Sequence, residues 1–312
     1  MSPEPVARAV EILARGGLVA FPTETVYGLG GDASNEAAVA RIYRVKGRPA
    51  DHPLIVHIGD ASLLARWARD VPADAHRLAE RFWPGPLTLV LKRATTVNER
   101  VTGGQDTVGL RVPGHPLALE LLRAFGGGIA APSANRFGKL SPTTADHVRR
   151  DLGTDVDLVL DGGPCEVGIE STIVDLSRGA PVLLRPGRIG AADIAAVIGA
   201  DPRPRDAAAP RASGTLEVHY APRHPLRLVS RIELAPALTR GSAVLAFEEA
   251  PAGATAAMWV RASSDPQRYA RELYALLRRL DEAAAATILV ERPPEGPGWE
   301  AILDRLTRAA GR

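Results

Sequence analysis

Apolar positions in the first two hundred residues switch between helical and strand spacing. Four apolar residues between 6 and 13 follow helical spacing and two glycines come shortly after, so we predict a helix over 6–13. The next apolar run, LVAF at 18–21, is short enough for a buried strand. A second helix is predicted to begin after Ser34 or Asn35, either of which can cap it, and to end near Gly47.

The same alternation continues to about residue 200 and predicts a mixed α/β domain with polar loops at several strand ends. Further strands are predicted at 54–58, 87–91, 108–112, the start of 128–135, 157–160, 171–176 and 181–185. Further helices are predicted at 60–70, 74–82, 115–124, 144–151 and 190–199.

Residues 200–225 break the pattern, because proline, alanine and arginine dominate and no period is visible. This composition is typical of an extended linker between domains. Alternation then resumes and predicts a small, mostly parallel three-layer domain over 226–312. Its strands are predicted at 226–230, 243–247, 256–260 and 287–291, and its helices at about 266–281 and 298–309.

Composition excludes some classes of protein but does not identify the function. A chain of 312 residues with 46% hydrophobic residues can bury a large core, and a net charge of +2 does not by itself indicate nucleic-acid binding. The single cysteine, Cys165, excludes an internal disulfide and a cysteine-rich zinc module. The sequence shows no signal-peptide pattern and no uncharged apolar run near 18 residues, so we expect a cytoplasmic protein.

The stretch FPTETVYGLG at 21–30 contains a candidate nucleotide motif. Gly28, Gly30 and Ala33 match the pattern G-x-G-x-x-A, and Asp51 follows at a suitable spacing. A dinucleotide turn needs its first glycine directly after the strand, whereas 22–27 intervene here, so this interpretation is disfavoured. No G-x-x-x-x-G-K-[ST] occurs either, so any ATP must be bound without a P-loop.

Polar and cationic residues recur at the predicted strand ends. Each has an ordinary structural explanation, and Ser133 has no base close in sequence that would make it a nucleophile. Their common position at strand ends of a mixed sheet is typical of a ligand site. The set comprises Thr25, Lys46, Arg48, His57, Arg111, Ser133, Asn135, Ser141, Ser171 and Arg185.

Several motifs, taken together and in order, resemble the YrdC/Sua5 family of L-threonylcarbamoyladenylate synthases. They are FPTETVYGLG (21–30), KGRPADHPLIVHI (46–58), FWPGPLTLVL (82–91), TVGLRVPGHP (107–116), APSAN (131–135), SPTT (141–144), ESTIVDL (170–176) and LLRPG (183–187). The resemblance continues through HYAP (219–222) into a second domain, as in the long Sua5 form. It implies a YrdC-like twisted mixed sheet with flanking helices and a concave cleft over 1–200, a linker or lid over 201–225, and a small Rossmann-like three-layer domain over 226–312.

The resemblance also implies a reaction. L-threonine, bicarbonate or CO2, and ATP would give threonylcarbamoyl-AMP and pyrophosphate, with Mg2+ accompanying the ATP. The product would pass to the machinery that makes N6-threonylcarbamoyladenosine in tRNA. Such a reaction needs alignment and charge neutralisation but no protein nucleophile.

Site roles follow from the same resemblance, position by position. Lys46 and Arg48 correspond to the K-x-R element and would be catalytic. The threonine site would comprise Thr25, His57, Arg111, Ala131 through its backbone, and Ser171. The ATP site would comprise Arg48, His52, Thr107, Ser133, Asn135, Ser141, Arg185 and Tyr220. No metal ligands are expected on the chain.

Three points stay open at this stage. The element before HYAP, RASGTLEVHYAP at 211–222, matches long family members only in part, so Tyr220 could reach the nucleotide or simply lie in a tether. An RNA-binding module without turnover is an alternative, with weak RNA binding possible in either case. A hydrogenase-maturation protein is disfavoured, because the zinc fingers of those proteins need more than one cysteine.

Overall fold

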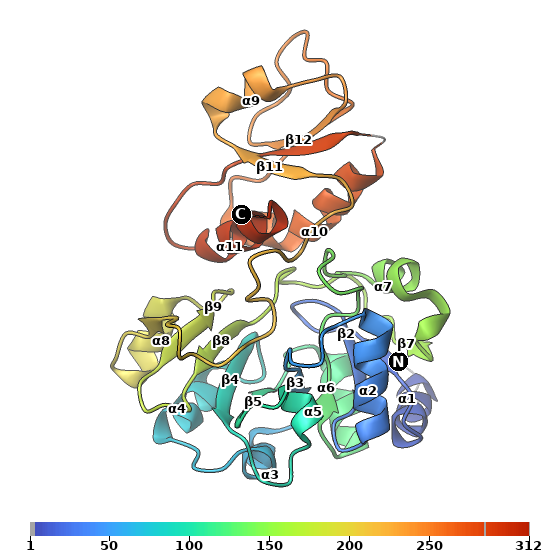
Figure 1. The fold of residues 1–312 in the computed structure, drawn as a ribbon, viewed down its shortest axis with the longest axis vertical. Coiled ribbons are helices and arrows are strands. Elements are labelled where there is room, and N and C mark those ends of the chain that lie inside the picture. Colours follow the sequence, from blue (N-terminus) through green and yellow to red (C-terminus); the bar gives the residue numbers. More distant parts are fainter. Residues whose placement is uncertain (1–3, 284, 312) are drawn as a thin grey trace. The chain divides into compact units, whose positions relative to one another are not determined.

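The computed structural model describes residues 4–283 and 285–311, which form two compact units (Figure 1). The first unit comprises the chain up to Phe137, together with Pro142–Glu166 and Glu170–Thr215. The second comprises Gly138–Ser141, Val167–Ile169 and the chain from Leu216 onward. Each unit has its own sheet, and the two are described separately.

A ten-stranded mixed sheet forms the centre of the first unit, in the order β10-β9-β8-β4-β5-β3-β6-β2-β1-β7. Pairing is antiparallel at five of the nine contacts, including β1 with β2 and β4 with β5, and parallel at the other four. The strands are β1 Val19–Phe21, β2 Gly28–Asp32, β3 Ile55–His57, β4 Leu87–Lys92, β5 Thr107–Arg111, β6 Ile129–Ala130, β7 Leu158–Val159, β8 Thr172–Asp175, β9 Val182–Arg185 and β10 Arg203–Pro204. The expected twisted mixed sheet with flanking helices is therefore confirmed.

Helices pack against this sheet through apolar faces. The helix α2 (Glu36–Lys46) begins at Asn35, whose side chain accepts hydrogen bonds from two backbone N–H groups, and ends at Gly47 with φ of 63°. The remaining helices are α1 Glu4–Ala14, α3 Leu64–Trp67, α4 Ala73–Phe82, α5 Glu99–Thr102, α6 Pro116–Phe125, α7 Ala145–Leu152 and α8 Ala191–Ile198, with 3₁₀ turns at Ala61–Leu63 and Gly153–Asp155.

Strand β2 was not predicted, because its sequence, GLGGD, has low strand propensity. The glycines are needed for close packing: a Cβ on Gly30 would lie 2.7 Å from Ile129 Cγ2 and 2.8 Å from Phe21 Cε1. The G-x-G pair therefore lies within a strand and not in a phosphate-binding turn. The helices α5 and α9 and the short strand β10 were also not predicted, and the helix expected over 60–70 is only a 3₁₀ turn followed by α3.

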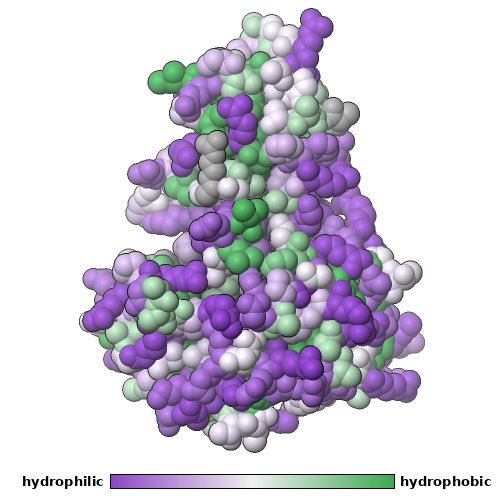
Figure 2. All heavy atoms as spheres, in the orientation of Figure 1, coloured by the Kyte–Doolittle hydropathy of each residue, from purple (hydrophilic) through white to green (hydrophobic). Residues whose placement is uncertain are grey.

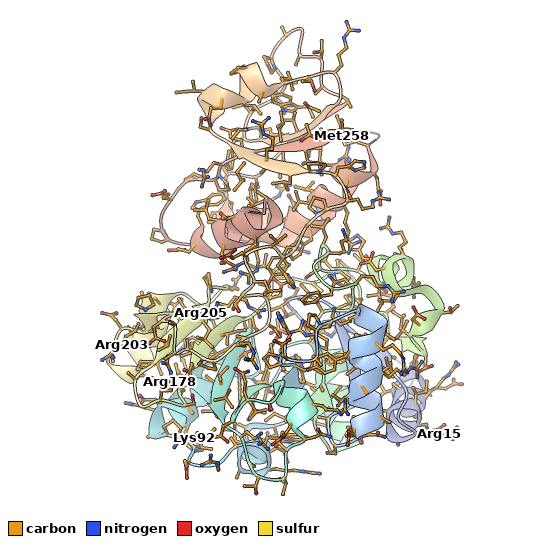
Figure 3. All side chains as sticks on the ribbon, in the orientation of Figure 1. Arg15, Lys92, Arg178, Arg203, Arg205 and Met258 are labelled. Carbon is orange, nitrogen blue, oxygen red and sulfur yellow. The ribbon has the colours of Figure 1, made fainter. Side chains whose placement is uncertain are left out.

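The sheet of the first unit ends at β10, which is exposed. Figure 3 shows Arg203, Arg205 and Arg178 near this edge, and Arg178 Nη1 lies 3.1 Å from Asp206 Oδ1. Charged residues and a proline are common on edge strands, where they discourage pairing with other chains. On the face drawn in Figure 2, hydrophilic residues likewise predominate over the first unit.

The second unit contains a four-stranded parallel sheet in the order β11-β14-β12-β13. Figure 1 shows α9 on one side of this sheet and α10 and α11 on the other, which confirms the predicted three-layer domain. Its elements are β11 Leu226–Val229, α9 Arg231–Ala237, β12 Ser242–Ala246, β13 Met258–Arg261, α10 Pro266–Glu282, β14 Thr287–Glu291 and α11 Glu300–Ala309. Among the described helices of both units, none combines the length and apolarity needed to cross a bilayer.

Candidate functional site

The loop after β1 folds around the hydroxyl of Thr23. Thr23 Oγ1 accepts hydrogen bonds from the N–H groups of Thr25 and Val26, both at 3.2 Å, and donates to Val26 O at 2.6 Å. Since its one proton goes to Val26 O, Thr25 must donate in the 2.8 Å contact between the two hydroxyls. This tight turn fixes the position of Thr25, which is fully buried. The hydroxyl oxygen of Thr25 still has lone pairs that can accept a hydrogen bond.

Glu24, in the same turn, holds Arg111 at the end of β5. Arg111 Nη2 donates to Glu24 Oε1 at 2.7 Å, and the N–H of Gly114 donates to Glu24 Oε2 at 2.8 Å. Arg111 Nε donates to Gly85 O at 3.2 Å. The two side chains are only 5% and 10% exposed. Within the described residues Arg111 Nη1 makes no hydrogen bond, so one guanidinium nitrogen is available to an anionic ligand.

His57 lies beside Arg111, because β3 and β5 are parallel and place these two residues in register. Its ring meets the ring of Phe21 edge-on at 5.9 Å, and its Nδ1 is buried without a hydrogen-bond partner in the described chain. Burial, and then the charge of Arg111, lower the pKa of His57 to about 3. The imidazole is therefore neutral at physiological pH and can pack against or hydrogen-bond an uncharged group.

This low pKa predicts a pH dependence of stability. The unfolded chain takes up a proton at His57 below pH 6.5, whereas the folded chain does so only near 3, so stability is lost as the pH falls. Between about pH 6.5 and 5 the loss from this group is about 2 kcal/mol. We expect His57→Gln to remove that part of the slope in urea unfolding measured across this range. The exposed His76→Gln is the matched control, and an unchanged slope in His57→Gln would contradict the assignment.

Lys46, the last residue of α2, is hydrogen-bonded to the loop that contains Ser133 and Asn135. Its Nζ donates to Ser133 O and Asn135 O, both at 2.6 Å, and to Asn135 Oδ1 at 3.3 Å. Burial, and then the charge of Arg48, lower the pKa of Lys46 well below its usual value. Three oxygen atoms of this loop accept hydrogen bonds from Nζ, so Lys46 fixes the orientation of the loop.

Two arginines that are far apart in sequence meet at Ser213. Arg48 Nη2 donates to Ser213 Oγ at 3.1 Å, and Arg185 Nη1 donates to Ser213 O at 2.9 Å. Arg185 also donates through Nε to Ser171 O at 3.0 Å and through Nη2 to Ser171 Oγ at 3.1 Å. Both guanidinium groups are buried. Their convergence on one small polar residue forms a site suited to an anion.

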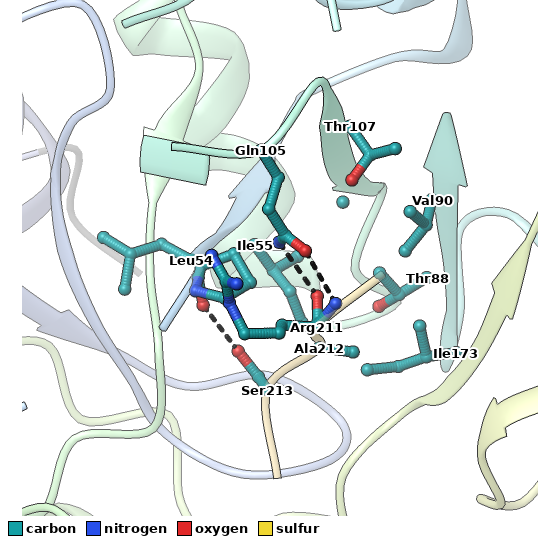
Figure 4. Close-up of a pocket in the computed structure, with 12 residues that line it drawn as sticks. Leu54, Ile55, Thr88, Val90, Gln105, Thr107, Ile173, Arg211, Ala212 and Ser213 are labelled. Carbon is teal, nitrogen blue, oxygen red and sulfur yellow. Dashed lines mark hydrogen bonds between the residues drawn. The ribbon is translucent and has the colours of Figure 1, made fainter. Parts of the chain in front are cut away.

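The segment that contains Ser213 packs on the sheet of the first unit (Figure 4). Gln105 and the backbone of Arg211 exchange two hydrogen bonds, at 2.7 and 3.1 Å, and Ala212 packs against Val90 and Ile173. A cavity of about 20 Å³ remains here, and Thr107 is among the residues that line it. Residues up to Thr215 thus belong to the first unit, although they lie in the predicted linker.

The structure brings most of the predicted site residues into three adjoining groups. Thr25, His57 and Arg111 are joined through β1, β3 and β5, and the N–H of Ala131 donates to Ile55 O beside them. Lys46, Ser133 and Asn135 form the second group. Arg48, Ser171 and Arg185 form the third, with His52 nearby, where its ring meets Phe137 edge-on at 5.4 Å.

Ser141 and Tyr220, both predicted to bind ATP, belong to the second unit. Tyr220 is buried with φ of 59°, and its ring lies against Tyr274 and beneath the guanidinium of Arg305. The ATP contacts predicted for Ser141 and Tyr220 therefore remain proposals.

Sequence reasoning did not identify Glu24, Thr23 or Ser213 as site residues. An acidic residue between two threonines at the end of a buried strand was a usable signal for the first two. No signal pointed to Ser213, because it lies in an aperiodic, proline-rich stretch. In the described chain no group of three or more His, Cys, Asp or Glu side chains is arranged to hold a metal ion.

Comparisons with known proteins match both units. A family model for Sua5, YciO and YrdC, described as "Telomere recombination", matches residues 11–187. A second model, described as "Threonylcarbamoyl-AMP synthase, C-terminal domain", matches residues 189–311.

Full-length relatives give the same result. The chain is 43% identical over 98% of its length to a threonylcarbamoyl-AMP synthase of Bacillus subtilis, and 40% identical over 97% to one of Pyrococcus abyssi, and it covers 93% of each. The crystal structure of P. abyssi Sua5 complexed with L-threonine superposes with a TM-score of 0.93 at 38% identity, covering 100% of this chain and 95% of that one.

Proposed function

The chain belongs to the YrdC/Sua5 family, and from this membership and the site geometry we propose that it is a threonylcarbamoyl-AMP synthase. Its substrates are L-threonine, ATP, and bicarbonate or CO2, and its products are threonylcarbamoyl-AMP and pyrophosphate. The observation that carries this proposal is the convergence of Arg48 and Arg185 on Ser213, with Lys46 nearby. Two guanidinium groups that converge in a buried site favour phosphate oxygens as ligands, because they donate strong, charge-assisted hydrogen bonds to them.

The triphosphate of ATP takes the positions that Ser213 now fills. Phosphate oxygens accept hydrogen bonds from guanidinium groups more strongly than a neutral hydroxyl or carbonyl does. Arg48 and Arg185 would therefore exchange their bonds to Ser213 for bonds to phosphate, and the segment 209–213 would move away. His52, Thr107, Ser133 and Asn135 surround the nucleotide in this arrangement, and the family resemblance assigns ATP contacts to Ser141 and Tyr220 of the second unit as well.

L-threonine binds in the group formed by Thr25, His57 and Arg111. Arg111 Nη1 is the available donor for the substrate carboxylate, and Glu24 holds the guanidinium so that this nitrogen stays oriented. The oxygen of Thr25 can accept from the substrate hydroxyl or amine. Because His57 is neutral, it can lie beside the uncharged form of the substrate amine without adding a positive charge to the site. The Ala131 backbone and Ser171 complete the threonine site.

The reaction joins the two sites without a covalent enzyme intermediate. The threonine amine attacks CO2 and loses a proton, which gives a carbamate. A carbamate oxygen then attacks the α-phosphorus of ATP, and the bond to pyrophosphate breaks. Arg48, Arg185 and Lys46 counter the charge of the two anionic reactants and of the leaving group, which is the main contribution a protein makes to such a transfer.

Mg2+ bound to the triphosphate would neutralise part of its charge. The described residues near Arg48 and Arg185 are mainly cationic and hydroxyl groups, which suit phosphate oxygens better than a metal ion. We further propose that the labile adenylate passes to the proteins that transfer the threonylcarbamoyl group to tRNA.

Release of pyrophosphate tests this function. The purified chain with ATP, Mg2+, bicarbonate and L-threonine is expected to release pyrophosphate, and omission of threonine should reduce the rate to background. A parallel assay with L-serine, which lacks the methyl group of threonine, tests whether the site recognises that methyl group. ATP consumption that does not depend on threonine would contradict the proposal.

A further inference from the structure

The second unit contains a groove along one edge of its sheet. Strand β11 lies at the edge of this sheet, and β14 is its one partner among the described strands. An open groove of about 570 Å³ follows it and is lined by β11, by α9 and α11, and by Arg292 just after β14. In Figure 1, α9 and α11 lie on opposite sides of the sheet next to β11. This volume is within the range of ligand pockets, roughly 300–1,000 Å³.

The backbone of β11 offers unused hydrogen-bonding groups to this groove. The carbonyls of Pro225 and Val229 accept from Ile288 and Arg292, both at 2.8 Å, so the odd-numbered residues of the strand point toward β14. By alternation, the N–H and C=O groups of Leu226 and Leu228 point to the opposite side. Neither pair bonds to another residue in the described chain. An edge with free donors and acceptors is a template for another strand.

The charges along the groove favour an anionic partner. Arg227 and Arg292 are exposed, and neither guanidinium makes a hydrogen bond or an ion pair with the described residues. Among the described residues that line the groove, Glu233 is the acidic one. Its Oε2 accepts from the N–H of Ser230 at 2.8 Å in a capping box, and its charge also interacts with Arg227 and Arg292, so two arginines face one carboxylate and the excess charge is positive.

We propose that the free edge of β11 binds an extended, acidic segment of a partner protein by addition of a strand. The segment bonds to the N–H and C=O groups of Leu226 and Leu228. Its carboxylates pair with Arg227 and Arg292. Main-chain hydrogen bonds supply affinity in this mode of recognition, and side-chain contacts supply specificity. A peptide fits better than a nucleic acid, because a row of alternating backbone donors and acceptors matches another peptide backbone.

Fluorescence anisotropy of the full chain with labelled peptides tests this proposal. The probe is an acetylated, amidated peptide of alternating glutamate and valine, about eight residues long to match an ordinary strand. The control peptide has lysine in place of glutamate. We expect the acidic peptide to bind at least about tenfold more tightly, which corresponds to about 1.4 kcal/mol. Hydrogen exchange should show new protection at the amides of Leu226 and Leu228.

Two variants separate the backbone contribution from the charge contribution. The double variant Arg227→Glu with Arg292→Glu should weaken acidic-peptide binding by about tenfold or more, whereas Arg240→Glu, an exposed arginine outside the groove, should leave it unchanged. Leu228→Pro removes one free N–H at an edge position that tolerates proline, and it should also weaken binding.

Three results would overturn the proposal. The first is equal binding of the acidic and basic peptides. The second is displacement of the peptide by a uridine-rich RNA oligonucleotide at lower concentrations than by unlabelled peptide. The third is self-association of the chain that is lost in Leu228→Pro while no peptide binds. Pyrophosphate release should be unaffected by all of these variants, so loss of groove binding is distinguishable from failure of the proposed reaction.

Discussion

Arg48→Ala is expected to lower threonine-dependent pyrophosphate release by about a hundredfold or more, because loss of one donor that stabilises transition-state charge commonly has an effect of this size. Arg48 is buried, and its Nη2 donates to Ser213 Oγ at the proposed phosphate site. The effect should fall mainly on kcat if the guanidinium contacts the reacting phosphate, and on KM for ATP if it only binds the nucleotide. Steady-state kinetics in both substrates distinguish the two.

Two further variants control for the charge and for the fold. Arg48→Lys keeps the charge but loses the planar fork, so it should recover only part of the activity. Arg44→Ala removes an exposed arginine from the preceding turn of α2 and should behave like the wild type. Because Arg48 also donates to His52 O and Pro53 O, thermal unfolding of each variant must accompany the kinetics. Wild-type turnover in Arg48→Ala would contradict the proposed phosphate site.

Glu24→Ala should both destabilise the first unit and weaken threonine binding. Removing one member of a buried ion pair leaves the other charge uncompensated, at a cost of about 3–5 kcal/mol. Arg111 would also lose the contact that orients its free Nη1 toward the substrate. We therefore expect a lower urea midpoint and a KM for threonine raised by about tenfold or more, while the KM for ATP changes little.

Glu24→Gln is the conservative control for this pair. A glutamine oxygen can still accept from Arg111, but its amide cannot accept from the N–H of Gly114, so only one of the two bonds survives. An intermediate loss of stability and a smaller rise in the KM for threonine are expected. If Glu24→Ala changed stability alone and left the KM for threonine unaltered, Glu24 would have no role in orienting Arg111.

Elements with strong local signals were predictable from the sequence. The helix α2 has a capping side chain at Asn35 and a left-handed glycine at its end, and both signals can be read directly. Strand β2 has neither side-chain bulk nor alternation, and it forms because its glycines let Phe21 and Ile129 pack closely. Helix α9 has only seven residues and contains Pro236, so its periodicity was too short to detect.

The candidate site was predictable in its chemistry but not in its connections. Motif order indicated which hydroxyl and cationic residues belong together, and the resemblance to a known family supplied their roles. The pairing of Glu24 with Arg111 depends on a turn and a strand end that are 87 residues apart. The bridge through Ser213 depends on how an aperiodic segment packs. Tertiary packing decides both, and no local pattern encodes either.

Incorporation of labelled bicarbonate tests the central claim most directly. The chain is incubated with ATP, Mg2+, L-threonine and either ordinary or ¹³C-labelled bicarbonate. The products are separated rapidly, and their masses are measured by mass spectrometry. The account predicts a species with the mass of threonylcarbamoyl-AMP, heavier by one mass unit when the bicarbonate is labelled and formed at least about a hundredfold more slowly in Arg48→Ala. AMP or threonyl-AMP formed without the label would contradict it.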